Sequence, residues 1–114
     1  MDAKRLREQA QELRDKAQNK RQNAIQSSQA AAAYSSSGDT GKAQNEQTKI
    51  AHLSDEAQKL EQQAVQTEQE LHNKESQILE IEKKKAQLQQ DMQNQVDNLE
   101  KQLQSLRGTT PSLF

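Results

Sequence analysis

The sequence predicts an all-α protein: an antiparallel helical hairpin whose long second helix forms a coiled coil and is expected to join into an oligomer. Apolar residues return every three or four positions along most of the 114 residues. From residue 42 to residue 107 the chain contains neither Pro nor Gly, so nothing interrupts a helix. Gly38 and Gly41 mark the one internal break.

Composition limits what such a chain can do. Only 30% of the residues are hydrophobic and 2% are aromatic, which excludes a thick globular core. A net charge of −1 offers no general attraction to nucleic acid or to an anionic membrane. The absence of Cys excludes disulfides and thiolate metal sites, and no apolar run approaches the roughly 20 residues of a membrane span. We therefore expect a cytoplasmic protein without cofactor, metal or small-molecule substrate, and without nucleic acid as a partner.

The first predicted helix covers residues 1–36, with Asp2 placed to cap its start. Alanine recurs at every seventh residue, which lets two helix backbones approach more closely than Leu would allow. A second series lies three positions behind and includes Lys20 and Ser27. The residues predicted to pack in the hairpin from this helix are Ala3, Leu6, Ala10, Leu13, Ala17, Ala24, Ala31 and Tyr34.

Residues 37–41 are predicted to form a turn, in which Gly38 takes the left-handed conformation that closes a helix and Asp39 or Thr40 caps the next one. A short turn favours an antiparallel pair. The second helix is predicted over residues 42–107, and its residues 42–74 are expected to pair with the first helix. The residues predicted to pack there are Ala43, Ile50, Leu53, Ala57, Leu60 and Ala64.

The distribution of charge supports this pairing. Residues 1–36 carry a net charge of +3, residues 37–75 carry −4, and residues 76–114 contain five basic and five acidic side chains. Opposite charge on two antiparallel helices favours the hairpin over the pairing of like segments.

Residues 75–107 would extend past the first helix and form a coiled-coil segment without a partner. Lys85 falls within this heptad series, as Lys74 does just before it, and could specify register or oligomer state. Leu88, Met92 and Val96 are spaced by four and four, a stutter that locally relaxes the supercoil. The predicted oligomerisation residues are Ile78, Ile81, Leu88, Met92, Val96, Leu99, Leu103 and Leu106.

Residues 108–114 are predicted to be a flexible tail. Gly108 and Pro111 both oppose a helix there. Leu113 and Phe114 are two large apolar residues without a local core, and they are candidates for a contact between assembled chains.

The candidate chemical motifs fail on inspection. Residues 38–42 read Gly-Asp-Thr-Gly-Lys, but a phosphate-binding loop needs four residues between its glycines and a Ser or Thr after the Lys. His52 and His72 lack the Glu three residues before them that metal sites in helical bundles use. Nothing pairs a nucleophile with a base, so we expect no enzyme.

The residues Ser28, Gln29, Ala30, Ala31, Tyr34, Gly38, Asp39, Lys42, Ala43, Ser54, Ala57, Leu60 and Ala64 form a recognisable pattern. Together they resemble the helical segment often found upstream of Smr-type nuclease domains. The resemblance covers residues 10–64 and implies a helical hairpin whose turn carries Gly-Asp. It implies no activity, because no residue of the nuclease domain can be carried over.

Three functions remain compatible with the sequence. The first is a structural, self-assembling coiled-coil protein that builds a scaffold, filament or lattice from copies of itself, in parallel or antiparallel association. The second is an adaptor whose residues 75–107 bind a helix of another protein. The third is a hairpin that binds an acidic or nucleic-acid partner through the basic side chains of the first helix, Lys4, Arg5, Arg7, Arg14, Lys20 and Arg21.

Overall fold

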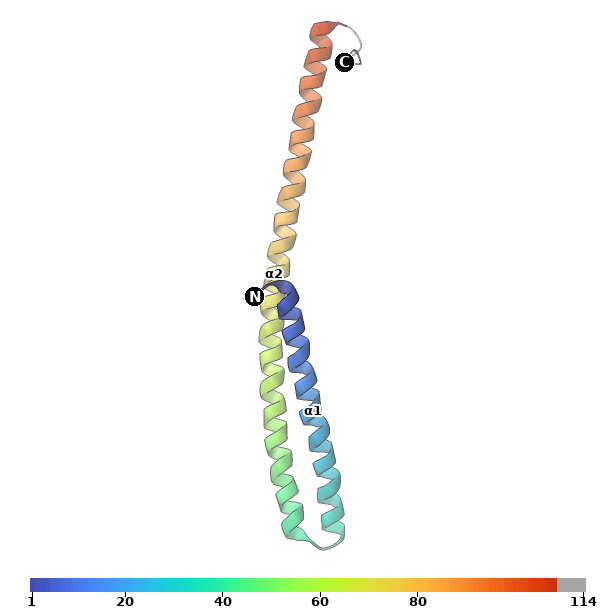
Figure 1. Ribbon diagram of the computed structural model, residues 1–114, viewed down its shortest axis with the longest axis vertical. Helices are drawn as coiled ribbons and strands as arrows, with labels where there is room; N and C mark the ends of the chain where they lie inside the picture. Colours follow the sequence, from blue (N-terminus) through green and yellow to red (C-terminus); the bar gives the residue numbers. More distant parts are fainter. Residues whose placement is uncertain (109–114) are drawn as a thin grey trace. The chain divides into compact units, whose positions relative to one another are not determined.

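The computed structural model describes residues 1–108 and contains two helices, α1 (Ala3–Ser36) and α2 (Thr40–Arg107) (Figure 1). No strand occurs among these residues, which confirms the predicted all-α class and the helical hairpin. Leu113 and Phe114, the predicted tail contacts, lie outside the described residues. A predicted flexible tail over residues 108–114 is described only at Gly108, which ends α2 with a φ of 68°.

The first helix begins at Ala3, and Asp2 is its N-cap, as predicted. The Asp2 carboxylate accepts a hydrogen bond from the backbone N–H of Arg5 at 2.8 Å, and the Asp2 carbonyl accepts from the N–H of Leu6 at 3.0 Å. Asp2 itself is extended, with ψ at 170°. The cap satisfies an N–H that has no partner within the helix.

The turn between the helices is shorter than the predicted residues 37–41. The N–H of Gly38 donates to the carbonyl of Ser35 at 3.2 Å, and the N–H of Asp39 donates to the carbonyl of Tyr34 at 3.0 Å. This pair of bonds is a Schellman motif, and Gly38 supplies the positive φ of 84° that it requires.

The second helix begins at Thr40 rather than at residue 42. Asp39 is the reason, since its carboxylate accepts a hydrogen bond from the N–H of Lys42 at 3.1 Å while its carbonyl accepts from Ala43 at 3.1 Å. Of the two predicted caps, Asp39 takes the role. Thr40 and Gly41 therefore belong to the first turn of α2.

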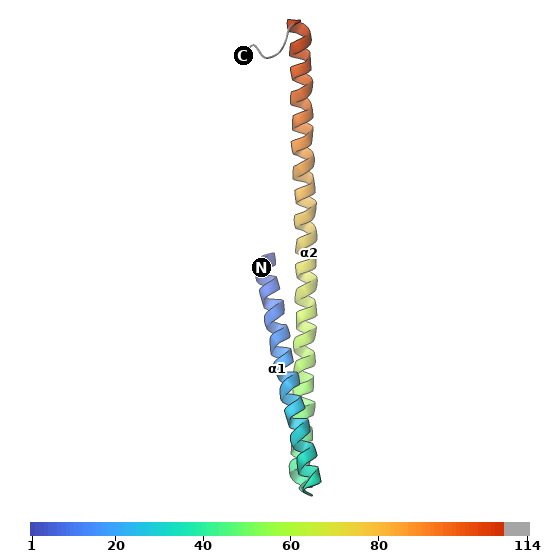
Figure 2. The same ribbon diagram turned by 90° about the vertical axis from the view of Figure 1, so that its right-hand side faces the viewer.

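Two compact units divide the chain, one covering Met1–Glu75 and the other beginning at Ser76. In the first unit α1 runs antiparallel beside the first part of α2, as the two perpendicular views show (Figures 1 and 2). The boundary extends one residue past the predicted pairing region of 42–74. From Ser76 to Arg107 the second unit is a single helical segment.

The core of the hairpin is thin and made chiefly of alanine. Leu6 is the largest fully buried side chain, at 2% exposure, and Ala57 and Ala64 are fully covered. The buried apolar residues are Leu6, Ala10, Ala17, Ala24, Ala31, Ala43, Ala57 and Ala64. Such a core buries little apolar area per residue, so close approach of the two backbones replaces bulk in holding the helices together.

Candidate functional site

All fourteen residues predicted to pack in the hairpin lie in the interior or at its edge. Eight of them are the buried residues named above. The other six, each half-buried, are Ala3, Leu13, Tyr34, Ile50, Leu53 and Leu60. Together the fourteen form what we call the hairpin seam.

On α2, two further residues belong to the same heptad series although the packing prediction omitted them. Thr67 is buried, and its hydroxyl donates a hydrogen bond to the carbonyl of Gln63 at 2.9 Å, so this buried hydroxyl has a partner. Leu71 is half-buried. Their spacing from Leu60 and Ala64 carried the signal, because each lies seven residues further along the helix.

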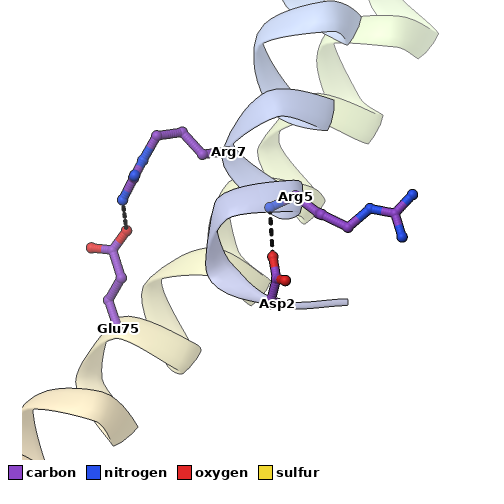
Figure 3. A network of polar contacts seen from close by, with 4 residues as sticks. All are labelled: Asp2, Arg5, Arg7 and Glu75. Carbon is purple, nitrogen blue, oxygen red and sulfur yellow. Dashed lines mark hydrogen bonds and ion pairs between the residues drawn. The ribbon is translucent and has the colours of Figure 1, made fainter.

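Beside the hairpin seam runs a ladder of three ion pairs between the helices. Arg7 pairs with Glu75 at 3.0 Å (Figure 3), and Arg14 pairs with Glu68. Arg21 donates two hydrogen bonds to the Glu61 carboxylate, at 3.0 and 3.2 Å. Each step of seven residues forward in α1 is matched by seven residues back in α2, and this fixes the antiparallel register of the pair.

A fourth contact closes the opposite flank. Lys20 pairs with Glu56 at 2.7 Å, and Glu56 also accepts from His52 of the same helix. The pKa of Glu56 is lowered, first by the hydrogen bond from Lys20. The pKa of Glu61 is likewise lowered by its hydrogen bond from Arg21, whose own pKa is raised by that partner. Because these side chains are exposed, they set register and partner choice more than stability.

The ladder bears directly on the basic face of α1. Four of the six cations predicted to form this basic face have carboxylate partners on α2, namely Arg7, Arg14, Lys20 and Arg21. Their charge is therefore matched within the hairpin, which weakens the case for an acidic partner on this face.

Tyr34 lies half-buried beside the turn, as its position in the heptad series predicts. The Nζ atom of Lys42 lies 5.6 Å from the centre of the Tyr34 ring, which is cation–π distance. The contact joins the last turn of α1 to the first turn of α2. Tyr34 thus closes the hairpin at the turn rather than presenting a free aromatic surface.

The second unit presents a different surface. All eight residues predicted for oligomerisation are exposed, between 46% for Val96 and 86% for Leu106. We call Ile78, Ile81, Leu88, Met92, Val96, Leu99, Leu103 and Leu106 the assembly seam. Heptad spacing places them along one stripe of the helix, interrupted only by the exposed Lys85.

Apart from the assembly seam, this segment is mostly polar, and several of its side chains form hydrogen bonds with one another. Gln87 donates to Asp91 at 3.0 Å, and Gln93 donates to Asp97 at 2.9 Å, each across one turn of the helix. Leu79 is the exception, because it is 55% exposed and lies off the seam. The prediction did not include it, since its position does not follow the heptad series.

Among residues 1–108, no three His, Asp or Glu side chains come together in a way that could hold a metal ion. Over the same range, neither helix has a stretch long and apolar enough to cross a membrane.

Comparison of the chain with protein-family models, with curated protein sequences and with solved structures found no match. The resemblance of residues 10–64 to the segment upstream of Smr-type nuclease domains therefore stays a prediction.

Proposed function

We propose that this chain is a structural, self-assembling coiled-coil protein. The assembly seam of one copy packs against that of another, and copies joined in this way build a scaffold, filament or lattice. The hairpin serves as a preformed rigid module within each building block. This proposal rests on packing surfaces rather than on any reactive group.

One observation carries the proposal: a seam of eight large apolar side chains, regularly spaced and exposed to water. Full burial of one such side chain contributes about 1.5–3 kcal/mol, so leaving all eight exposed forgoes most of the apolar energy that this segment could contribute. Scattered apolar residues on a surface are ordinary, but a continuous stripe at heptad spacing is typical of a helix that packs against other helices.

The charges of the same segment are compatible with a second copy as the partner. Residues 76–114 contain five basic and five acidic side chains, so two copies meet without net repulsion. The hairpin differs in this respect, because its ladder matches a basic helix with an acidic one. Like segments can therefore associate in the second unit, whereas the two unlike helices of the first unit select each other.

The seam is tested by replacing an apolar residue with lysine. We expect Leu99→Lys combined with Ile81→Lys to convert the assembled protein into a monomer, because each change puts an ammonium group in the buried stripe. Light scattering over a concentration series measures the mass, and circular dichroism checks that the hairpin stays helical.

Leu79→Lys is the matched control. Leu79 is 55% exposed and Leu99 is 58% exposed, so both changes remove a similarly exposed leucine, but only Leu99 lies on the seam. The control is expected to keep the native mass. A doubly substituted protein that also kept it would show that the seam is assigned wrongly. A natural chain that is monomeric at every concentration would contradict self-assembly and leave the seam to a helix of another protein.

A further inference from the structure

We infer that two copies of residues 76–107 pair antiparallel about a two-fold axis at Met92. This inference rests on the proposed self-assembly and specifies its geometry: Ile78 of one copy lies level with Leu106 of the other, and Ile81 with Leu103. Met92 faces its own counterpart at the centre.

The spacing of the seam is the first argument. Counting Lys85, the seam has nine positions, and successive separations are three, four, three, four, then four, three, four, three. This series reads the same from either end, and its centre is Met92. Reversing one helix therefore places a seam position opposite every seam position of the other. Apart from Met92, which faces its own counterpart, each residue that begins a three-residue step then lies level with a residue that ends such a step, as in other antiparallel coiled coils.

The stutter makes this register unique among antiparallel arrangements near it. Sliding one helix by seven residues in one direction sets Leu88 opposite Gln89, and sliding it in the other direction sets Val96 opposite Gln95. Either shift buries a glutamine side chain or leaves a leucine or valine without an apolar neighbour. All nine seam positions lie opposite seam positions only when the stutter of one copy lies opposite the stutter of the other.

Lys85 supplies the second argument, because it distinguishes antiparallel from parallel pairing. In a parallel pair in register, the two Lys85 side chains would share one layer, and like charges within a core repel. In the antiparallel pair each Lys85 lies level with Leu99, and its ammonium group can extend along the helix to water. The two lysines are then separated by two full heptads.

The hairpin supplies the third argument, since it shows which flanking positions meet in an antiparallel pair of this sequence. Every member of the Arg–Glu ladder directly follows a second-series heptad residue, as Arg7 follows Leu6 and Glu61 follows Leu60. In the proposed pair, Glu82 directly follows Ile81 and Arg107 directly follows Leu106. By the same geometry, Glu82 of one copy therefore meets Arg107 of the other. The two-fold axis makes two such pairs of opposite charge.

Three further pairs of flanking positions bring no like charges together. The same register sets Gln89 beside Glu100, Lys84 beside Gln95, and Gln77 beside Gln102. Each of these three pairs contains at least one uncharged side chain.

Single cysteines test the geometry, because the natural chain contains none. A disulfide forms only between Cα atoms closer than about 7 Å. We prepare Ile81→Cys and Leu103→Cys, label one of them with a heavy nitrogen isotope, refold them together and oxidise. The expected product is the mixed disulfide, identified by its mass, with little of either symmetric one. Met92→Cys is expected to form a symmetric disulfide, and Leu79→Cys, off the seam, is expected to form none.

The outcomes separate this inference from the function on which it rests. Symmetric disulfides of Ile81→Cys and of Leu103→Cys, without the mixed product, would mean a parallel pair and overturn the antiparallel geometry while self-assembly stands. If no variant forms a disulfide and light scattering gives a monomer, self-assembly fails as well.

Discussion

At the scale of single residues, the two glycines beside the turn have opposite roles. Gly38 has a φ of +84°, a conformation that L side chains rarely adopt, although nothing lies within 4 Å of the position a Cβ would take. Gly41 is helical, and a Cβ there would lie 3.9 Å from the Asp39 carboxylate, an ordinary contact. Only Gly38 is required by the backbone conformation.

This difference predicts effects of opposite sign. Gly38→Ala is expected to lower the free energy of unfolding of the hairpin by about 1–2 kcal/mol, the cost of a left-handed alanine. Gly41→Ala is expected to raise it by about 0.5–1 kcal/mol, because alanine loses less backbone entropy in a helix. Urea unfolding followed by circular dichroism measures both, in the Ile81→Lys, Leu99→Lys background that is expected to be monomeric. Equal effects of the two changes would contradict the assignment of the turn.

At the scale of helices, alanine at the interface determines how closely α1 and α2 approach. Ala57 is fully covered at the middle of the pair, whereas Ala51 on the same helix is exposed. A larger side chain at Ala57 has no space unless the helices separate, and separation would weaken the packing of the neighbouring layers.

Ala57→Leu is therefore expected to destabilise the hairpin by about 1–3 kcal/mol, as overpacking of a core commonly does. Ala51→Leu serves as the control, with an expected change within about 0.5 kcal/mol, since both residues are strong helix formers and the site is exposed. The same urea titration compares the two. A neutral result for Ala57→Leu would mean that the helices do not depend on close approach.

At the scale of the whole molecule, the charges link the fold to pH. The pKa of Glu61 and of Glu56 is lowered below the ordinary value of 4.5 by hydrogen bonds from Arg21 and Lys20. A carboxylate with a lowered pKa stabilises the folded state fully above its unfolded pKa, and the contribution is lost as the pH falls through the folded value. Protonation of these two carboxylates also lowers the negative charge of residues 37–75 that faces the net +3 of residues 1–36.

We thus expect the stability of the hairpin to be level near neutral pH and to decrease as the pH falls below about 4.5. Urea unfolding at a series of pH values, again in the Ile81→Lys, Leu99→Lys background, measures this. The double variant Glu56→Gln, Glu61→Gln should begin less stable and lose less in acid. An unchanged acid dependence in that variant would place its origin in other carboxylates.

The molecule also shows what a sequence of this kind reveals and what it does not. Heptad spacing predicted the all-α class, because the order of apolar residues survives a low apolar content. The short turn at Gly38 and the opposite charges of residues 1–36 and 37–75 predicted the hairpin. The observed start of α2 lies two residues before the predicted residue 42, since capping by Asp39 makes Thr40 and Gly41 helical. The partners within the ladder were not predicted, because pairing Arg14 with Glu68 requires the register of the two helices, which depends on where the turn ends.

For the assembly seam too, the sequence predicts some features and not others. Its residues could be predicted from spacing, and the structure adds that they are exposed in the single chain. Leu79 could not be anticipated as a further exposed leucine, since nothing in the periodicity marks it. The occupant of the seam depends on association between chains, which the cysteine experiment addresses.

The alanines of the hairpin have one more consequence, which concerns conformational freedom. An alanine side chain has no rotamers to lose on burial, whereas each buried Leu or Ile loses about 0.5–1 kcal/mol of rotamer entropy. At Ala17, Ala57 and Ala64 the interface therefore cannot adapt by changing side-chain conformation. The Leu, Ile, Met and Val side chains from Ile78 to Leu106 retain that capacity. One helix, α2, therefore carries a stretch of fixed shape followed by one that can adjust to whatever packs on it.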